Sequence, residues 1–231
     1  MTIQRRRRIV RSKRKGTGIA LVAAISFLAG LTDAIGLQLS GDFVSFMTGN
    51  TTRAAISFEQ GDFWHAFVLI GAIFTFVIGN AIGILIAHTF DRRIFAVLMA
   101  VGIVLAVAAT LGSADVALMR FNAVVLAMGM VNATVEHIEG LPIGLTYVTG
   151  ALSRLGRGIG RMLLGERGFD WTVQLVPWAG MATGALCGAA IAIGLPEQAL
   201  AIAAGLTLIF AAVTLLIPRS LQHRFNQRPA H

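Results

Sequence analysis

Six long apolar segments constrain the fold of this chain more than any other feature of its sequence. A helix of about 20 apolar residues crosses the hydrocarbon core of a bilayer. The six segments cover residues 18–39, 63–87, 94–111, 116–138, 173–195 and 199–217. Only 13% of the residues are charged, against about a quarter in a soluble domain. Because the period-two alternation of a strand barrel is absent, we predict an all-α polytopic membrane protein.

Two shorter and more polar segments, residues 42–58 and 142–156, lie between the apolar ones. Polar groups of this kind cannot face lipid, so they must be buried in protein or line a wet cavity. We therefore predict two short re-entrant or broken helices, with full spans as the open alternative. Pro142 suits the first turn of the second helix. Asp42 could serve the first helix through the attraction of its carboxylate to the helix dipole.

The sequence also contains an internal repeat. Three pairs of short stretches match in the same order along the chain: GLTDA at 30–34 with GMVNA at 129–133, FMTGN at 46–50 with YVTGA at 147–151, and Gly79-xxx-Gly83 with Gly184-xxx-Gly188. The matching residues lie 99, 101 and 105 positions apart. We predict one membrane domain over 17–217, with repeats at about 18–112 and 116–217, between tails at 1–16 and 218–231.

Basic residues indicate how the two repeats are oriented. The loop at 59–62 has none, but the equivalent region of the second repeat carries Arg154, Arg157, Arg161 and Arg167. Conversely, Arg92 and Arg93 have no basic counterpart at 196–198. Since basic loops favour the cytoplasm, equivalent loops should lie on opposite sides of the membrane. We predict two inverted repeats of three spans each.

The N-terminal tail is strongly basic and holds eight of the 19 Lys and Arg residues. Next to an apolar segment, this arrangement is typical of a cytoplasmic flank, and anionic lipid would strengthen it. We therefore predict a bacterial inner-membrane protein with both termini in the cytoplasm. A nucleic-acid partner is not expected.

Asp33 is the most informative polar residue because it lies well inside the first apolar segment. An ionisable group at membrane depth is costly and is a functional candidate, either as a proton carrier or as a cation ligand. It could instead hold the first short segment in place by pairing with Arg53 or by bonding to Thr48 or Asn50. Its repeat counterpart, Asn132, cannot titrate.

Thr48-Gly49-Asn50 and Thr149-Gly150 are the second group of candidates. Glycine lets a backbone or a solute come close, while Thr and Asn offer hydrogen-bonding groups. In an inverted pair these stretches would meet near the midplane, where secondary transporters bind substrate. The predicted substrate-binding residues are Asp33, Thr48, Gly49, Asn50, Asn132, Thr149 and Gly150. The alternative is close helix packing, with Thr bonding to its own helix.

Two glycine series predict close helix packing rather than binding. They are Gly79 and Gly83 in one apolar segment, and Gly180, Gly184 and Gly188 in its repeat counterpart. The spacing of four residues puts each series on one helix face. Thr75 and Asn80 in the first of these segments either line a site or hydrogen-bond between helices.

Glu136-His137-x-Glu139 has a metal-like composition, but a zinc site needs about three ligands in a set geometry. No phosphate-binding Gly-Lys-Ser/Thr loop and no Gly-x-Ser-x-Gly elbow occurs in the sequence. We therefore expect no metal, no cofactor and no catalytic residue, and we do not expect an enzyme.

Two motifs resemble the signatures of a known family. Gly30-x-x-Asp33-Ala34 followed by the run from Gly41 to Asn50 is similar to the first signature of the YoaK-like bacterial membrane proteins. The run GMVNA followed by TYVTG at 146–150 is similar to the second. The resemblance covers about residues 18–217, and the Arg-rich tail is outside it. It implies a multi-spanning inner-membrane protein, and it brings no settled substrate or catalytic residue.

These features predict a small secondary transporter or channel-like permease for a small polar solute or ion. At 231 residues the chain is short for a transporter, which favours a homodimer. Two alternatives remain open. One is a non-transporting structural or regulatory membrane protein, and the other is a membrane-embedded enzyme that acts on lipid through Glu136, His137 and Glu139.

Overall fold

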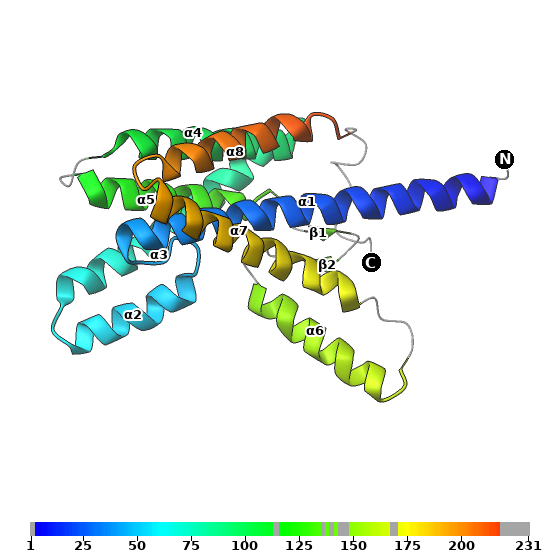
Figure 1. Cartoon of the computed structure of the whole chain (residues 1–231), viewed down its shortest axis with the longest axis horizontal. Helices are drawn as coiled ribbons and strands as arrows, with labels where there is room; N and C mark the ends of the chain where they lie inside the picture. Colours follow the sequence, from blue (N-terminus) through cyan, green and yellow to red (C-terminus); the bar gives the residue numbers. More distant parts are fainter. Residues whose placement is uncertain are drawn as a thin grey trace.

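The computed structural model describes residues 3–112, 116–134, 137–138, 141–142, 148–166 and 171–217. This part of the chain is almost entirely helical (Figure 1). The helices are α1 (Ile3–Ser40), α2 (Met47–Glu59), α3 (Phe63–Thr89), α4 (Arg93–Thr110), α5 (Ala117–Val131), α6 (Val148–Leu163), α7 (Leu175–Gly194) and α8 (Ala199–Thr214). A short 3-10 turn, η2 (Trp171–Gln174), precedes α7, and β1 (His137–Ile138) pairs with β2 (Leu141–Pro142).

Six of these helices coincide with the six predicted apolar segments. Those long and apolar enough to cross a membrane are Gly16–Ser40, Phe63–Thr89, Arg93–Thr110 and Leu175–Gly194. The apolar helices α5 and α8 are shorter, at 15 and 16 residues. The prediction of an all-α polytopic membrane protein is confirmed.

The fourth apolar segment ends earlier than predicted. Helix α5 stops at Val131, and the extension to residue 138 was wrong. The amides of Ala133 and Thr134 bond to carbonyls three residues back, and the Thr134 hydroxyl also bonds to Val131 O at 2.6 Å. These tight bonds replace the i to i−4 pattern and close the helix.

The six apolar helices alternate in direction. The end of α1 meets the starts of α3, α5 and α8 around one cavity, and we call this end of the bundle the far end. At the opposite end, the tail end, Arg92 before α4 donates to Leu215 O after α8 at 2.8 Å. Gly180, Gly184 and Gly188 meet Ala23, Phe27 and Leu31 in the same order, so α7 runs parallel to α1. Helices α1, α4 and α7 therefore run toward the far end, and α3, α5 and α8 run back.

Two helix pairs, α1 with α7 and α3 with α5, pack through glycines and form two seams. In each seam a side chain on a glycine would collide with the backbone of the facing helix. The contacts of the α1–α7 seam are Gly30 with Met181, Gly184 with Phe27, and Gly188 with Leu31. Those of the α3–α5 seam are Gly129 with Phe76, Gly79 with Leu126, and Gly83 with Met130. Each residue has its counterpart in the other seam, 99 or 105 positions away.

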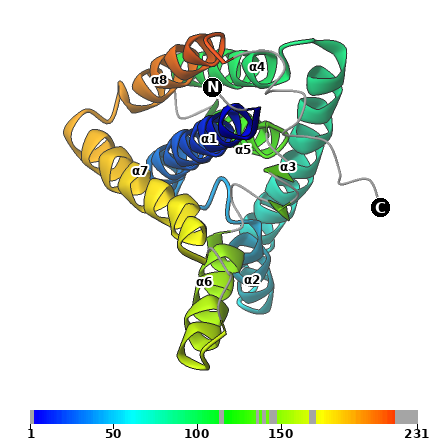
Figure 2. The same ribbon diagram turned by 90° about the vertical axis from the view of Figure 1, so that its right-hand side faces the viewer.

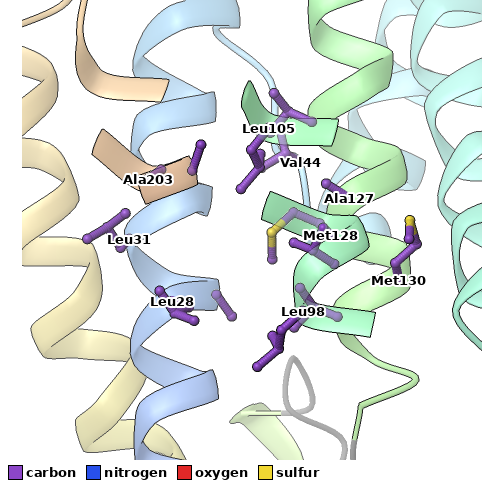
Figure 3. Close-up of a cluster of buried hydrophobic side chains, with 14 of the residues drawn as sticks. Leu28, Leu31, Val44, Leu98, Leu105, Ala127, Met128, Met130 and Ala203 are labelled. Carbon is purple, nitrogen blue, oxygen red and sulfur yellow. The ribbon is translucent and has the colours of Figure 1, made fainter. Parts of the chain in front are cut away.

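The buried apolar core lies between the two seams. Most of its side chains come from α1, α4, α5 and α8, together with Val44 of the segment after α1, and α3 and α7 add a few alanines (Figure 3). Leu31 points toward α7, and its counterpart Met130 points toward α3 (Figure 3). Many outward side chains are also apolar, including Phe67, Phe74 and Leu186, which are exposed by more than 60%. An apolar outer face is what a helix bundle presents to lipid.

The first short polar segment re-enters the bundle. Gly41 turns the chain at φ 78°, and residues 41–46 are not helical. The amides of Val44 and Ser45 bond to Asp33, seven residues before the end of α1, so the chain has turned back to that depth. Helix α2 then returns to the far end, where Ser57 contacts His65 at the start of α3. With 13 residues, α2 is about 20 Å long and too short to span.

Helices α2 and α6 project from the same side of the bundle and diverge toward opposite ends (Figures 1 and 2). Both begin later than predicted. Helix α2 begins at Met47, its N-cap is Phe46 without a side-chain bond, and Asp42 plays no capping role, so that prediction was wrong. The placement of Pro142 in the first turn of a helix was also wrong, since it pairs with His137 in a strand. Proline favours extended backbone in the preceding residue, and this suits the strand.

Candidate functional site

Asp33 supports the re-entrant segment through its carboxylate. Its Oδ1 accepts hydrogen bonds from the amides of Val44 at 3.2 Å and Ser45 at 2.9 Å. These amides lie outside any helix and need acceptors inside the bundle. The alternative of a holding role therefore has a structural basis, but the groups that bind Asp33 belong to Val44 and Ser45 rather than to Arg53, Thr48 or Asn50.

Asn50 holds the same segment from the other side. Its side chain is fully buried, and Nδ2 donates to Phe43 O at 2.7 Å. Its Oδ1 is also buried and has no hydrogen-bond partner among the described residues. Leaving a buried polar atom unpaired costs about 1–3 kcal/mol. This oxygen is thus a group that a bound cation or hydrogen-bond donor would satisfy.

Thr48 and Gly49 make local contacts in and beside α2. Thr48 is exposed on α2, and its carbonyl accepts from the Thr52 hydroxyl at 3.2 Å. A side chain at Gly49 would strike the ring of Phe46. That ring packs edge-on against Phe43, with centroids 5.3 Å apart. Gly49 therefore makes room for an aromatic pair beside the helix.

The candidates of the second repeat belong to α5 and α6. Asn132 caps the end of α5, where Nδ2 donates to Met128 O at 3.4 Å. Thr149 is exposed and Gly150 half-buried in the first turn of α6. Tyr147, the aromatic residue of this motif, lies outside the described residues. None of the seven predicted binding residues lines the cavity described next.

A cavity of about 300 Å³ opens at the far end, and we call it the far-end cavity. It is lined by Gly36, Leu39, Ser40, Asp42, Val44, Trp64, His65, Val68, Ala117, Leu118, Arg120, Phe121, Val124 and Leu200. Four helix ends and the re-entrant segment contribute these residues. No single stretch of sequence could have indicated it, because the helix ends come from distant parts of the chain.

Asp42 is the centre of a polar network on one wall of this cavity. Its carboxylate receives Arg53 Nη2 at 3.2 Å and His65 Nε2 at 3.0 Å. Arg53 also donates to Gly41 O at 2.7 Å, and the other ring nitrogen of His65 lies 3.0 Å from Ser57 Oγ. The network ties the re-entrant segment to both α2 and α3. Asp42, Arg53 and His65 are visible in the sequence as charged or polar residues, but their spacing does not show that they pair with one another.

The glycines that were predicted to pack helices together lie in the two seams, and so does Thr75. Gly79, Gly83, Gly184 and Gly188 contact facing backbone, and Gly180 faces the carbonyl oxygen of Ala23. The Thr75 hydroxyl donates to Asn122 Oδ1 at 2.9 Å, which joins α3 to α5.

The described residues contain no group of three or more His, Cys, Asp or Glu side chains that could hold a metal ion. Glu136 and Glu139 lie outside the described residues, so the metal-like triplet is not part of this observation.

Comparison with known proteins places the chain in an uncharacterised membrane group. The family described as "Protein of unknown function (DUF1275)" matches residues 21–213. The UPF0700 transmembrane protein RA0705 of Rhizobium meliloti (strain 1021) is 52% identical over 228 residues, covering 98% of this chain and 99% of the relative. No solved structure matches.

Proposed function

The chain belongs to the DUF1275 family of integral membrane proteins, and from this premise we propose that it is a small secondary transporter or channel-like permease. Its solute would be a small polar molecule or ion. The family membership agrees with the resemblance to YoaK-like proteins in the two motifs. We further propose that the chain is not an enzyme.

The observation that carries this proposal is the reciprocity of the two seams. Three glycine contacts in one seam recur in the other at the same repeat positions, and the six apolar helices alternate in direction. This pattern supports an inverted repeat of three spans plus three. Inverted repeats with broken helices are the common plan of secondary transporters, which bind solute between the halves.

The re-entrant segment supplies the second argument. Backbone away from helical geometry is tolerated at membrane depth where it is buried in protein or lines a cavity. Asp33 and Asn50 hold residues 41–46 there, and Asn50 keeps one buried oxygen unpaired among the described residues. We propose that Asn50 Oδ1 contributes to the solute path, with Asp33 maintaining its shape.

The charge distribution supports a bacterial inner-membrane location with the tail end in the cytoplasm. Arg92 lies at the tail end, and α6 carries Arg154, Arg157 and Arg161 on one face. Basic residues favour the cytoplasmic side and attract anionic lipid. We propose anionic lipid and a second copy of the chain as partners, and no nucleic acid.

One observation favours the rival function of a non-transporting structural protein. The Asp33 carboxylate already binds two backbone amides, which is a holding role. The two functions differ in a measurable property, since only a transporter moves solute across a sealed bilayer.

Uptake into proteoliposomes tests the proposal. The full chain is reconstituted, and a panel of sugars, amino acids, organic acids and inorganic ions is compared with protein-free liposomes. We expect faster uptake of at least one solute and a loss of about tenfold or more in Asn50→Leu, since one polar contact contributes about 1.4 kcal/mol.

Thr183→Val is the matched control. Thr183 is exposed on α7 and its hydroxyl bonds only to its own helix, so uptake should be unchanged. If monodisperse wild-type protein moves no solute of the panel faster than empty liposomes do, the transport proposal fails and the structural rival stands.

A further inference from the structure

We propose that the far-end cavity binds a small organic anion with an apolar body, and that Arg120 holds its carboxylate. The proposal rests on the proposed function only where it identifies this anion as the transported solute. Binding itself can be measured without transport.

The apolar part of the inference comes from the walls of the cavity. Most of its lining is hydrocarbon, with Leu39 from α1, Val68 from α3, Phe121 and Val124 from α5, and Leu200 from α8. Small-molecule sites are mainly apolar with a few convergent polar groups. A volume of about 300 Å³ is at the lower end of such sites. It fits a single ring or a branched chain better than a phospholipid with two acyl chains.

The charge of the ligand follows from the charged groups that line the cavity. These are Asp42, His65 and Arg120. The Asp42 side chain is 10% exposed, and Arg53 and His65 both bind its carboxylate, so its negative charge is already balanced. The Asp42 carboxylate therefore does not need a cationic ligand to balance its charge.

Arg120 is the charge that remains. It is half-buried in the first turn of α5, at the far end, and has no hydrogen-bond or ion-pair partner among the described residues. A guanidinium group presents a planar fork of donors that matches a carboxylate in two parallel hydrogen bonds. An apolar cavity with one unbalanced guanidinium selects an apolar anion over a neutral or cationic molecule of the same shape.

Equilibrium binding tests the site. The full chain in phosphatidylcholine nanodiscs is titrated with phenylacetate, and its neutral isostere phenylacetamide is titrated in parallel. Trp64 lines the cavity, so its fluorescence reports binding, and Trp64→Phe identifies that signal among the three tryptophans. We expect phenylacetate to bind at least about tenfold more tightly than phenylacetamide.

Substitution of the arginine gives the decisive comparison. Arg120→Gln should weaken phenylacetate binding about tenfold or more, and Arg120→Lys should restore part of the loss because the charge remains. Arg157→Gln, on an exposed face of α6, is the matched control and should bind as wild type does. Equal affinity in wild type and Arg120→Gln, equal affinity for the two ligands, or no binding to wild type at millimolar concentration would each overturn the inference.

The phosphate of an anionic lipid is the other negatively charged group that Arg120 can bind. The titration is repeated in nanodiscs that contain phosphatidylglycerol. Unchanged phenylacetate affinity supports the small anion, whereas a tenfold loss assigns Arg120 to a lipid phosphate and overturns the inference. Failure of binding with intact uptake of another solute rejects this site alone, and intact binding without uptake rejects transport alone.

Discussion

The α1–α7 and α3–α5 seams occupy matching repeat positions but are completed by different chemistry. Three glycine contacts with facing backbone are common to both seams. At the next matching position, Gly180 faces the Ala23 carbonyl in one seam, while Thr75 bonds to Asn122 in the other. The difference shows that glycine fixes the distance between the helices, and that the remaining position can be closed either by packing or by a hydrogen bond.

The two halves also differ at the polar residue that lies three positions after the seam glycine of α1 and of α5. Asp33 carries a carboxylate that binds two amides of the re-entrant segment, whereas Asn132 caps its own helix. The shared backbone plan therefore does not imply shared polar chemistry. Substitutions at matching positions of the two halves therefore test how far the shared plan extends.

The largest expected effect concerns the orientation of the two halves in the membrane, because each introduced cysteine is either labelled or not labelled. Cys187 is first replaced by Ala, and single cysteines are introduced as Gln60→Cys, Gln198→Cys and Asp91→Cys. A membrane-impermeant maleimide added to intact cells should label positions 60 and 198 and not position 91, since 91 lies at the tail end. Labelling of 91 together with 198 would mean that the equivalent loops share one side, and the inverted repeat would be rejected.

The seam glycines should give the next largest effect. Gly79→Leu and Gly184→Leu each force a side chain into facing backbone, and overpacking of this kind costs about 3 kcal/mol or more. Melting temperature and the monodisperse fraction in detergent measure the loss. Gly71→Leu, in the same helix as Gly79 but in open space, is the control and should fold normally. A tolerated Gly184→Leu would show that only one seam is essential.

Asp33 and Asn132 should respond unequally. Asp33→Ala leaves the amides of Val44 and Ser45 without their acceptor, at a cost of about 1–3 kcal/mol for each. Asp33→Asn keeps an acceptor oxygen and should be milder, and Asn132→Ala milder still. The rate of thiol labelling at Val44→Cys, a buried position of the segment, reports its opening. Equal rates in the Asp33→Ala and Asp33→Asn backgrounds would argue against the acceptor role.

Thr75 should have the smallest effect. Thr75→Val removes the bond to Asn122, and interhelical bonds in membranes average about 0.6 kcal/mol. Thr183→Val removes a bond within one helix and provides the baseline in a melting experiment. A loss several times larger than this baseline would show that the hydrogen bond, and not the glycines, controls the α3–α5 seam.

Much of the fold could be predicted from the sequence because apolar length and glycine spacing are local signals. The six apolar segments, the two shorter helices and the Gly79 and Gly184 series were all readable in this way. The start of α2 was not, because Asp33 reaches forward to residues 44 and 45 and replaces a helical turn. The start of α6 was not, because Pro142 pairs with His137 in a strand. A helix-start rule considers only neighbouring residues, and it cannot see an acceptor 11 or 12 positions away.

The candidate site was less predictable for the same reason. Asp33 and Asn50 stand out in the sequence as polar groups near the broken segment, yet the backbone atoms of residues 43–45 that they bind carry no sequence signal. Pairing of Arg53 with Asp33 was one alternative left open by the sequence, but Arg53 pairs with Asp42. Arg120 received no role, because the far-end cavity forms only when helix ends far apart in the sequence come together.

Each seam joins a helix of the first half to a helix of the second half, and this limits how such a chain could originate. Helix α1 of the first half closes on α7 of the second, and α5 of the second half closes on α3 of the first. Neither half can therefore bury its own glycine face, and a half-length chain would be complete only beside a second copy inserted in the reverse direction. A chain cut between α4 and α5 should accordingly regain its fold when both pieces are made together, while either piece alone should be degraded.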